Sequence, residues 1–138
     1  MKKRYSLVVI MILLSLLLGG CSLMTDQSTE KQEMIQIAES QKMKVAIESY
    51  LKNLDPEALT PNGKIKSYRI LKDKLKYNPM EGIIVEIVIN RDDRLTIDMT
   101  VVEEDSGEYL VATSGTPKEL TKLIERDKQY SMIHLQIG

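Results

Sequence analysis

The sequence predicts an α+β fold in which helices flank an antiparallel meander sheet of about four strands, arranged in two layers. Apolar residues at helical spacing over residues 30–53 predict the first helix. A β-branched run at residues 83–90, followed by apolar–polar alternation over residues 94–102, predicts neighbouring strands. In the sequence Thr116-Pro117-Lys118-Glu119, Thr116 is expected to cap a helix, with Pro117 in its first turn and Glu119 completing a capping box, which predicts a C-terminal helix.

The first helix is expected to run from residue 30 to residue 53. Thr29 and Gln32 have the spacing of a capping box at its start. The apolar stripe is weak before Met43 and regular after it, so the second half is expected to dock on the sheet and the first half to form a partly exposed stalk. Pro56 ends the helix, because the residue before a proline is disfavoured in the helical conformation.

Four segments with strand-like patterns follow, and the short turns between them indicate an antiparallel meander. They are residues 64–71, 83–90, 94–102 and 108–113. Between the first two the pattern is ambiguous, although Asn78-Pro79 and Gly82 mark a tight turn. Met43 and Met99 are expected in the core, since the chain has no Phe or Trp to fill space there.

The C-terminal helix is expected to end near Lys128, and residues 131–138 then alternate between apolar and polar side chains. This alternation predicts a last strand, with the single histidine, His134, facing solvent on it. Ser131 lies three residues before His134, but no Gly-x-Ser-x-Gly turn exposes a serine nucleophile. We therefore expect no serine–histidine catalytic site.

The N-terminus combines a basic start, Met1-Lys2-Lys3-Arg4, with an apolar run over residues 5–18 that leads into Leu18-Gly19-Gly20-Cys21. The apolar run has 14 residues, whereas a membrane-spanning helix, the alternative interpretation, needs about 20. These parts match a secretory signal, and Cys21 is the only cysteine of the chain. The segment resembles the lipobox of bacterial lipoproteins.

The lipobox resemblance implies a signal peptide at residues 1–20, with Leu18, Gly19 and Gly20 preceding the cleavage site. It also implies a diacylglyceryl group on the sulfur of Cys21, and two acyl chains are sufficient for stable anchoring. Residues 21–29 would then form a lipidated tether and residues 30–138 a single α+β domain. We accordingly expect the membrane as a partner and a position on the extracytoplasmic face of the cell membrane.

The charge balance and the absence of certain motifs exclude several classes of partner and cofactor. The chain has 19 Lys and Arg against 20 Asp and Glu, a formal net charge of −1. Loss of Lys2, Lys3 and Arg4 with a leader leaves 16 against 20, or −4, which argues against nucleic acid as a partner. The sequence contains no glycine-rich phosphate loop, no calcium loop and no His and Cys ligand set. We therefore expect neither a metal nor a cofactor.

A local basic stretch stands out against this acidic background. Its members are Lys64, Lys66, Arg69, Lys72, Lys74 and Lys76. Lysines of this kind prevent edge-to-edge pairing when they lie on an edge strand, and they attract anionic lipid headgroups when they face a membrane. The edge interpretation is favoured because the rest of the chain is acidic.

The loop that follows, Tyr77-Asn78-Pro79-Met80, is the candidate partner contact of the domain. Met80 is an apolar side chain on a turn, and methionine is common on adaptable binding surfaces. We expect it either to cover the core or to contact a partner together with Tyr77, Asn78 and Pro79.

Four short segments between residues 33 and 102 form a recognisable pattern. They are Glu33-Met34-Ile35, Lys52-Asn53-Leu54-Asp55-Pro56, Ser67-Tyr68 and Asn78-Pro79-Met80-Glu81-Gly82-Ile83. The pattern resembles a family of small proteins of unknown function from streptococcus-like Gram-positive bacteria, in which a second glycine stands where this chain has Glu81. The resemblance implies one domain behind a membrane-directed N-terminus and brings no activity with it.

The expected function is that of a non-catalytic binding or accessory module of the cell envelope, with an envelope protein or a peptide as partner. An immunity or exclusion role is one version of it. The alternatives are an envelope-active enzyme or hydrolase accessory that uses acids such as Asp98 or Glu86, and a structural spacer. The leader octapeptide at residues 13–20 also resembles the mating signals that some Gram-positive bacteria release from lipoprotein leaders. The ligand, the pathway and the oligomeric state stay open.

Overall fold

The computed structural model describes residues 8–12, 25–79 and 82–137. The chain divides into two compact units, residues 1–33 and residues 34–138, of which the second contains the sheet. In the first unit, residues 8–12 are helical and exposed. Among the described helices, none is both long enough and apolar enough to cross a membrane.

The expected single helix over residues 30–53 is wrong, because the chain forms two helices there, α2 (Thr25–Ala38) and α3 (Gln41–Leu54). The break lies at Ser40, whose Oγ accepts a hydrogen bond from the backbone N of Met43 at 3.2 Å and donates one to the carbonyl of Ile37 at 2.7 Å. A serine hydroxyl in this position ends one helix and caps the next. The expected cap at Thr29 is also wrong, since α2 already begins at Thr25.

The sheet has five antiparallel strands in the order β1-β3-β4-β5, with β2 also paired to β3. They are β1 (Tyr68–Ile70), β2 (Lys76–Tyr77), β3 (Ile83–Ile89), β4 (Thr96–Glu103) and β5 (Tyr109–Gly115). Two 3₁₀ turns, η1 (Lys72–Lys74) and η2 (Asp93–Leu95), stand before β2 and β4. The α+β class and the antiparallel meander are confirmed. Of the basic stretch, only Arg69 in β1 and Lys76 in β2 lie on strands at this edge of the sheet, whereas the other four members lie in the loop before β1 and in η1.

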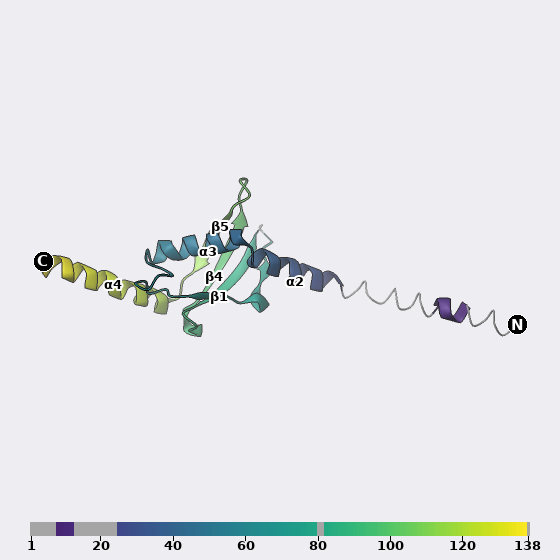
Figure 1. Ribbon diagram of the computed structural model, residues 1–138, viewed down its shortest axis with the longest axis horizontal. Helices are drawn as coiled ribbons and strands as arrows, with labels where there is room; N and C mark the ends of the chain where they lie inside the picture. Colours follow the sequence, from purple (N-terminus) through teal and green to yellow (C-terminus); the bar gives the residue numbers. More distant parts are fainter. Residues whose placement is uncertain (1–7, 13–24, 80–81, 138) are drawn as a thin grey trace. The chain divides into compact units, whose positions relative to one another are not determined.

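The core lies between α3 and one face of the sheet, as Figure 1 shows. Helix α3 buries four side chains against alternate residues of β3 and β4. The fully buried larger side chains include Met43, Ile47, Leu51, Val85, Ile87, Ile97 and Met99. Each such side chain contributes about 1.5–3 kcal/mol when it leaves water. The expected core positions of Met43 and Met99 are therefore confirmed.

Two polar side chains organise the loop between α3 and β1. Asp55, only 8 % exposed, accepts hydrogen bonds from the backbone N of Glu57, Lys64 and Ile65. Asn90 accepts from the backbone N of Lys66 and of Ser67, and it donates to the carbonyl of Lys64. These side chains satisfy the backbone of residues 64–67, which explains why the expected strand over 64–71 is reduced to β1.

The C-terminal segment forms one helix, α4 (Lys118–Ile137), and the strand expected over residues 131–138 is wrong. A short run in which every second residue is apolar is compatible with a strand or with the end of a helix. In this chain the helix that begins at Lys118 continues through the run. His134 accordingly lies in α4, where its side chain is outside the described residues. Thr116 was expected to cap this helix, and its hydroxyl instead lies 2.9 Å from the Tyr50 hydroxyl of α3.

The burial of Tyr68 in β1, together with its contact with Glu48 of α3, gives the domain an alkaline pH dependence. Burial, the charge of Glu48 and a hydrogen bond to Glu48 raise the pKa of Tyr68 from 10.0 to about 12. The unfolded chain therefore loses the Tyr68 proton before the folded domain does. Stability from this contact is complete below about pH 10, and the free energy of unfolding falls as the pH rises from about 10 to about 12.

The expected result is that the Glu48→Gln variant ionises Tyr68 at lower pH than the parent, with burial alone keeping its pKa above 10.0. Phenolate absorbance during an alkaline titration, with Tyr68→Phe to identify the signal, measures this. Urea unfolding at about pH 9 and about pH 11 should show a smaller loss of stability for Tyr68→Phe than for the parent. Identical titration curves for Glu48→Gln and the parent would contradict the assignment.

Candidate functional site

A partly apolar cavity of about 260 Å³ lies where α2, α3 and the ends of four strands meet. Apolar side chains line most of it, and Tyr77 of β2, Tyr109 of β5 and Glu103 of β4 border it. Ile37 and Met43 belong to its helical side, although Met43 is fully buried beneath it.

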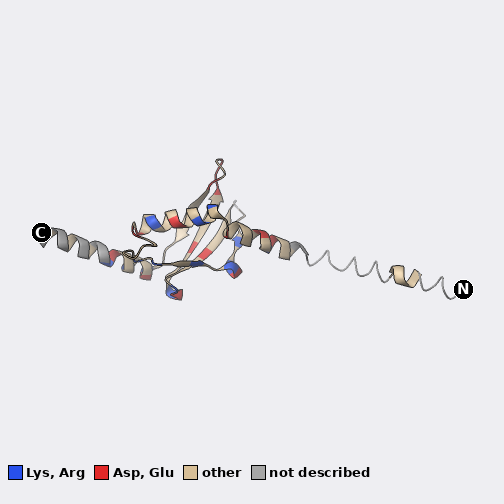
Figure 2. Cartoon of the chain, in the orientation of Figure 1, with Lys and Arg blue, Asp and Glu red and all other residues tan. Residues whose placement is uncertain are grey.

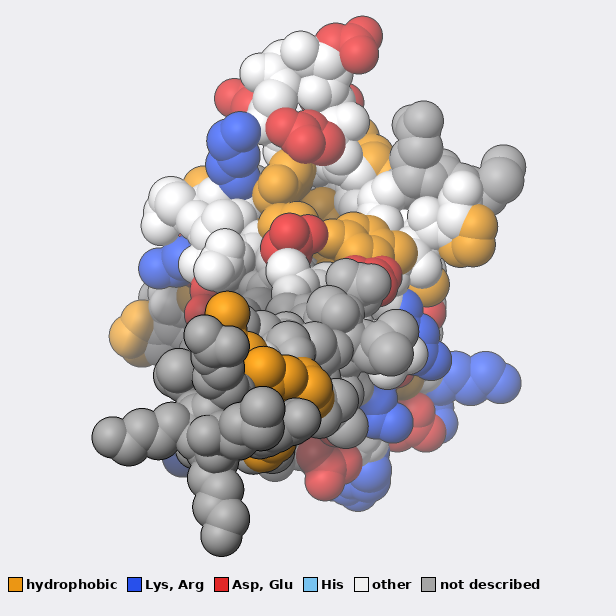
Figure 3. Space-filling view, turned by 90° about the vertical axis from the view of Figure 1, so that its right-hand side faces the viewer, with side chains coloured by type: hydrophobic (Ala, Val, Ile, Leu, Met, Phe, Trp, Pro, Cys, Tyr) orange, Lys and Arg blue, Asp and Glu red, His pale blue; other side chains and the backbone are white. Residues whose placement is uncertain are grey.

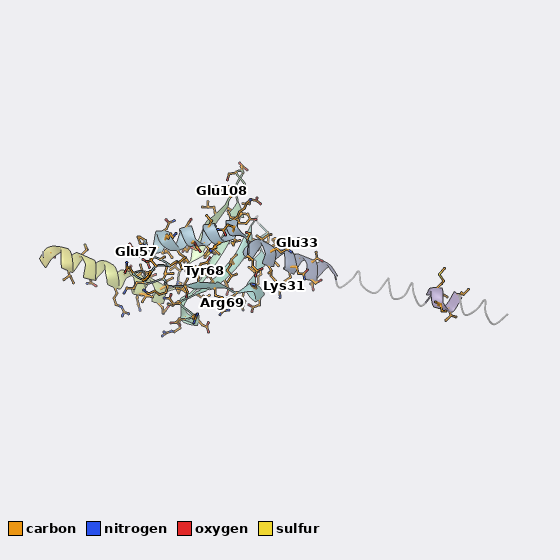
Figure 4. All side chains as sticks on the ribbon, in the orientation of Figure 1. Lys31, Glu33, Glu57, Tyr68, Arg69 and Glu108 are labelled. Carbon is orange, nitrogen blue, oxygen red and sulfur yellow. The ribbon has the colours of Figure 1, made fainter. Side chains whose placement is uncertain are left out.

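A second hollow of about 230 Å³ lies beside the start of α3. It is lined by Gln41, Lys42, Val45, Glu108 and Tyr109, so the Tyr109 ring borders both hollows. The ammonium nitrogen of Lys42 lies 5.8 Å from the centre of that ring, within the range of a cation–π contact. We call these two hollows the Tyr109 site. Figure 3 shows apolar side chains exposed below the acidic turn between β4 and β5, and Figure 4 labels Glu108 at this turn.

Gly82 shapes the wall of the Tyr109 site on the side of the β2–β3 turn. Its carbonyl accepts a hydrogen bond from the backbone N of Asn78 at 3.1 Å, which closes the turn. Its φ is +111°, and a Cβ atom there would lie 2.5 Å from the carbonyl oxygen of Val101. Only glycine fits both the backbone conformation and this close approach.

The candidate partner loop borders the Tyr109 site in part. Tyr77 lines the first hollow and is 43 % exposed. Asn78 is half-buried and Pro79 is exposed. Met80 lies outside the described residues, and so do Leu18, Gly19, Gly20 and Cys21, which leaves their roles as predictions.

Sequence reasoning missed Tyr109, Val45 and Lys42. The only signal for Tyr109 was an aromatic residue at the beginning of a strand, directly after an acidic turn. Val45 is an apolar residue outside the buried stripe of α3 and is 54 % exposed, so the helical period predicts its exposure but gives it no role.

The size of the two hollows of the Tyr109 site suits side chains better than a whole small molecule. Pockets for small-molecule ligands usually exceed about 300 Å³, whereas each hollow here suits one or two side chains. One cation, Lys42, and the acids Glu103 and Glu108 lie on the borders of the hollows. Within the described part of the chain, no group of three or more His, Cys, Asp or Glu residues is placed to hold a metal ion.

The acids considered for catalysis lie elsewhere. Glu86 of β3 and Asp98 of β4 are direct cross-strand partners. Neither lines the Tyr109 site, nor a third cavity of about 520 Å³ that is bordered by Ser67, Tyr68, Arg69, Val88 and Arg91. The paired acids of a glycosidase flank the bond that they cleave, and no such cleft surrounds this pair among the cavities described here.

The fold and the site together define a small α+β domain with a helix packed on an antiparallel sheet and two apolar hollows at the start of that helix. The chain belongs to DUF1310, a family of proteins of unknown function, which it matches over residues 5–123. This range is longer than the resemblance over residues 33–102 that the short motifs indicate, and it begins at the first residue of the apolar run over residues 5–18. No curated protein and no solved structure matches the chain.

Proposed function

We propose that this DUF1310 protein is a lipid-anchored binding module on the extracytoplasmic face of the cell membrane, and that the Tyr109 site binds a peptide segment of an envelope protein. The observation that carries the binding proposal is a pair of adjoining apolar hollows that share the Tyr109 ring. The anchor rests on separate grounds and has a separate test.

The anchor proposal rests on the sequence Leu18-Gly19-Gly20-Cys21 after a short apolar run. The family match begins at residue 5, within that run, which supports the leader as a shared part of these proteins. Mass spectrometry of the protein purified from a Gram-positive host is expected to find Cys21 as the N-terminal residue, carrying a diacylglyceryl group. A chain that still begins at Met1 would contradict the anchor.

An extended peptide is the occupant that the surroundings of the Tyr109 site favour. Tyr109 is the first residue of β5, which is an edge strand paired only with β4 among the described strands. An edge strand offers backbone N–H and C=O groups to an added strand, and neighbouring pockets take its side chains. Lys42 on one side and Glu103 and Glu108 on the other would orient charged residues of that peptide.

The Val45→Asp variant is expected to lose the partner, because it places a carboxylate in an apolar hollow where it would be desolvated on binding. Val45 is already 54 % exposed, so the fold should tolerate the change. Ile133→Asp is the matched control, since Ile133 of α4 is 50 % exposed and borders neither hollow. Chemical crosslinking in cells, followed by purification and mass spectrometry, should recover one envelope protein with the parent and with Ile133→Asp only. Equal recovery with Val45→Asp would contradict the assignment of the site.

A further inference from the structure

The third cavity, of about 520 Å³, is distinguished by two arginines. Arg69 of β1 and Arg91, in the turn between β3 and η2, line it together with Ser67, Tyr68 and Val88. Figure 4 labels Tyr68 and Arg69 on β1, and Figure 2 shows the basic positions on β1 and at the two short helical turns. We call this cavity the arginine pocket.

The backbone at Arg91 is unusual for a residue with a large side chain. The N of Asp92 donates to the carbonyl of Ile89 at 3.0 Å, closing a turn in which Asn90 and Arg91 have φ values of 53° and 59°. Such a turn favours asparagine followed by glycine. Asn90 fits this preference, whereas Arg91 occupies the position of the glycine at a cost in stability. Left-handed residues of this kind cluster at ligand sites.

The described carboxylates beside the arginine pocket have other partners. Glu48 of α3 is hydrogen-bonded to Tyr68, which lines the pocket. The nearest carboxylate in sequence, Asp92, accepts hydrogen bonds from Nε and Nη2 of Arg94 at 3.0 and 2.8 Å, and these bonds lower the pKa of Asp92. Among the described residues, neither Arg69 nor Arg91 forms an ion pair. Two exposed arginines that form no ion pair with a described residue therefore line one pocket, on a chain whose net charge is −1.

We propose that the arginine pocket binds a phosphate group. A guanidinium donates two parallel hydrogen bonds to phosphate oxygens, and two arginines together balance the charge of a phosphate better than that of a single carboxylate. The Ser67 hydroxyl supplies a further donor, and the volume leaves room for the group that bears the phosphate. That phosphate belongs to a lipid headgroup or to free phosphate, and the test separates these two sources.

The test uses the full chain in detergent, titrated by calorimetry with inorganic phosphate and with glycerophosphoglycerol, the headgroup of phosphatidylglycerol without its acyl chains. Arg91→Gly is expected to weaken binding of the preferred anion at least about tenfold, and to raise the melting temperature because glycine suits the turn. Arg69→Gln should weaken binding similarly without the gain in stability. Lys76→Gln removes one charge from the same sheet edge outside the pocket, and should change affinity less than about twofold.

Tighter binding of glycerophosphoglycerol assigns the pocket to a lipid headgroup, and tighter binding of inorganic phosphate assigns it to free phosphate. The proposal is overturned if the parent binds neither anion, or if Lys76→Gln weakens binding as much as Arg91→Gly does. A lower melting temperature for Arg91→Gly would show that the backbone at Arg91 is not strained. The left-handed turn would then no longer indicate a ligand site, and the proposal would be overturned as well.

Discussion

Asp55→Ala is expected to lower the free energy of unfolding by about 3 kcal/mol or more, one of the two largest effects that we predict for a single substitution. The carboxylate accepts three backbone hydrogen bonds, from Glu57 at 3.2 Å, Lys64 at 2.7 Å and Ile65 at 3.0 Å. Each buried donor left without a partner costs about 1–3 kcal/mol. The loop between α3 and β1 would lose its fixed conformation together with that stability.

Urea unfolding of the Asp55→Ala and Asp55→Asn variants measures this effect. Asparagine keeps one acceptor oxygen, so Asp55→Asn should lose part of the stability that Asp55→Ala loses. Asp73→Ala, at an exposed position of η1, is the control and should change the free energy of unfolding by less than about 0.5 kcal/mol. If the Asp55 and Asp73 variants unfold alike, Asp55 does not organise the loop.

Gly82→Ala is expected to lower the free energy of unfolding by about 2 kcal/mol or more. The substitution meets two obstacles, the φ of +111° and the carbonyl oxygen of Val101, 2.5 Å from the new Cβ. The chain can relieve that contact only by moving backbone, which would displace the β2–β3 turn and Tyr77 beside the Tyr109 site.

Gly107→Ala is the matched control for Gly82→Ala. Gly107 also has a positive φ, +80°, but the nearest atom to an added Cβ is the flexible ammonium of Lys42 at 3.6 Å. Its loss of stability should therefore be smaller, and the difference between the two variants measures the close approach at Gly82. Thermal unfolding of both variants gives that difference. A loss for Gly107→Ala as large as that for Gly82→Ala would contradict the role of the Val101 contact.

The spacing of apolar residues along the sequence predicted the parts of the fold in which buried and exposed side chains alternate. The segment Ile83–Ile89 and its neighbour Thr96–Glu103 form strands as expected, because their apolar residues repeat on one face. The break at Ser40 was missed, although the apolar stripe weakens before Met43, because a single serine hydroxyl separates the two helices. The strand expected over residues 131–138 failed because a short apolar repeat does not distinguish a strand from the end of a helix.

The candidate sites were harder to predict, because their residues come together only in the folded chain. Tyr77 was expected to contact a partner, but its association with Tyr109 depends on the pairing of β2, β3, β4 and β5. Arg69 was noted as one member of a basic stretch. Its proximity to Arg91 follows from the register that sets Tyr68 opposite Ile89, and no local sequence pattern encodes that register.

Photo-crosslinking in living cells tests the central claim, that a lipid-anchored domain binds a peptide segment at the Tyr109 site, most directly. A photoreactive amino acid replaces Tyr77 in one strain and the exposed Ile133 of α4 in another, each with Cys21 or with Cys21→Ala. We expect position 77 to crosslink to one envelope protein when the chain keeps Cys21. That product should be lost in Cys21→Ala, and position 133 should give none. Equal crosslinking from both positions, or from both forms of residue 21, would contradict the account.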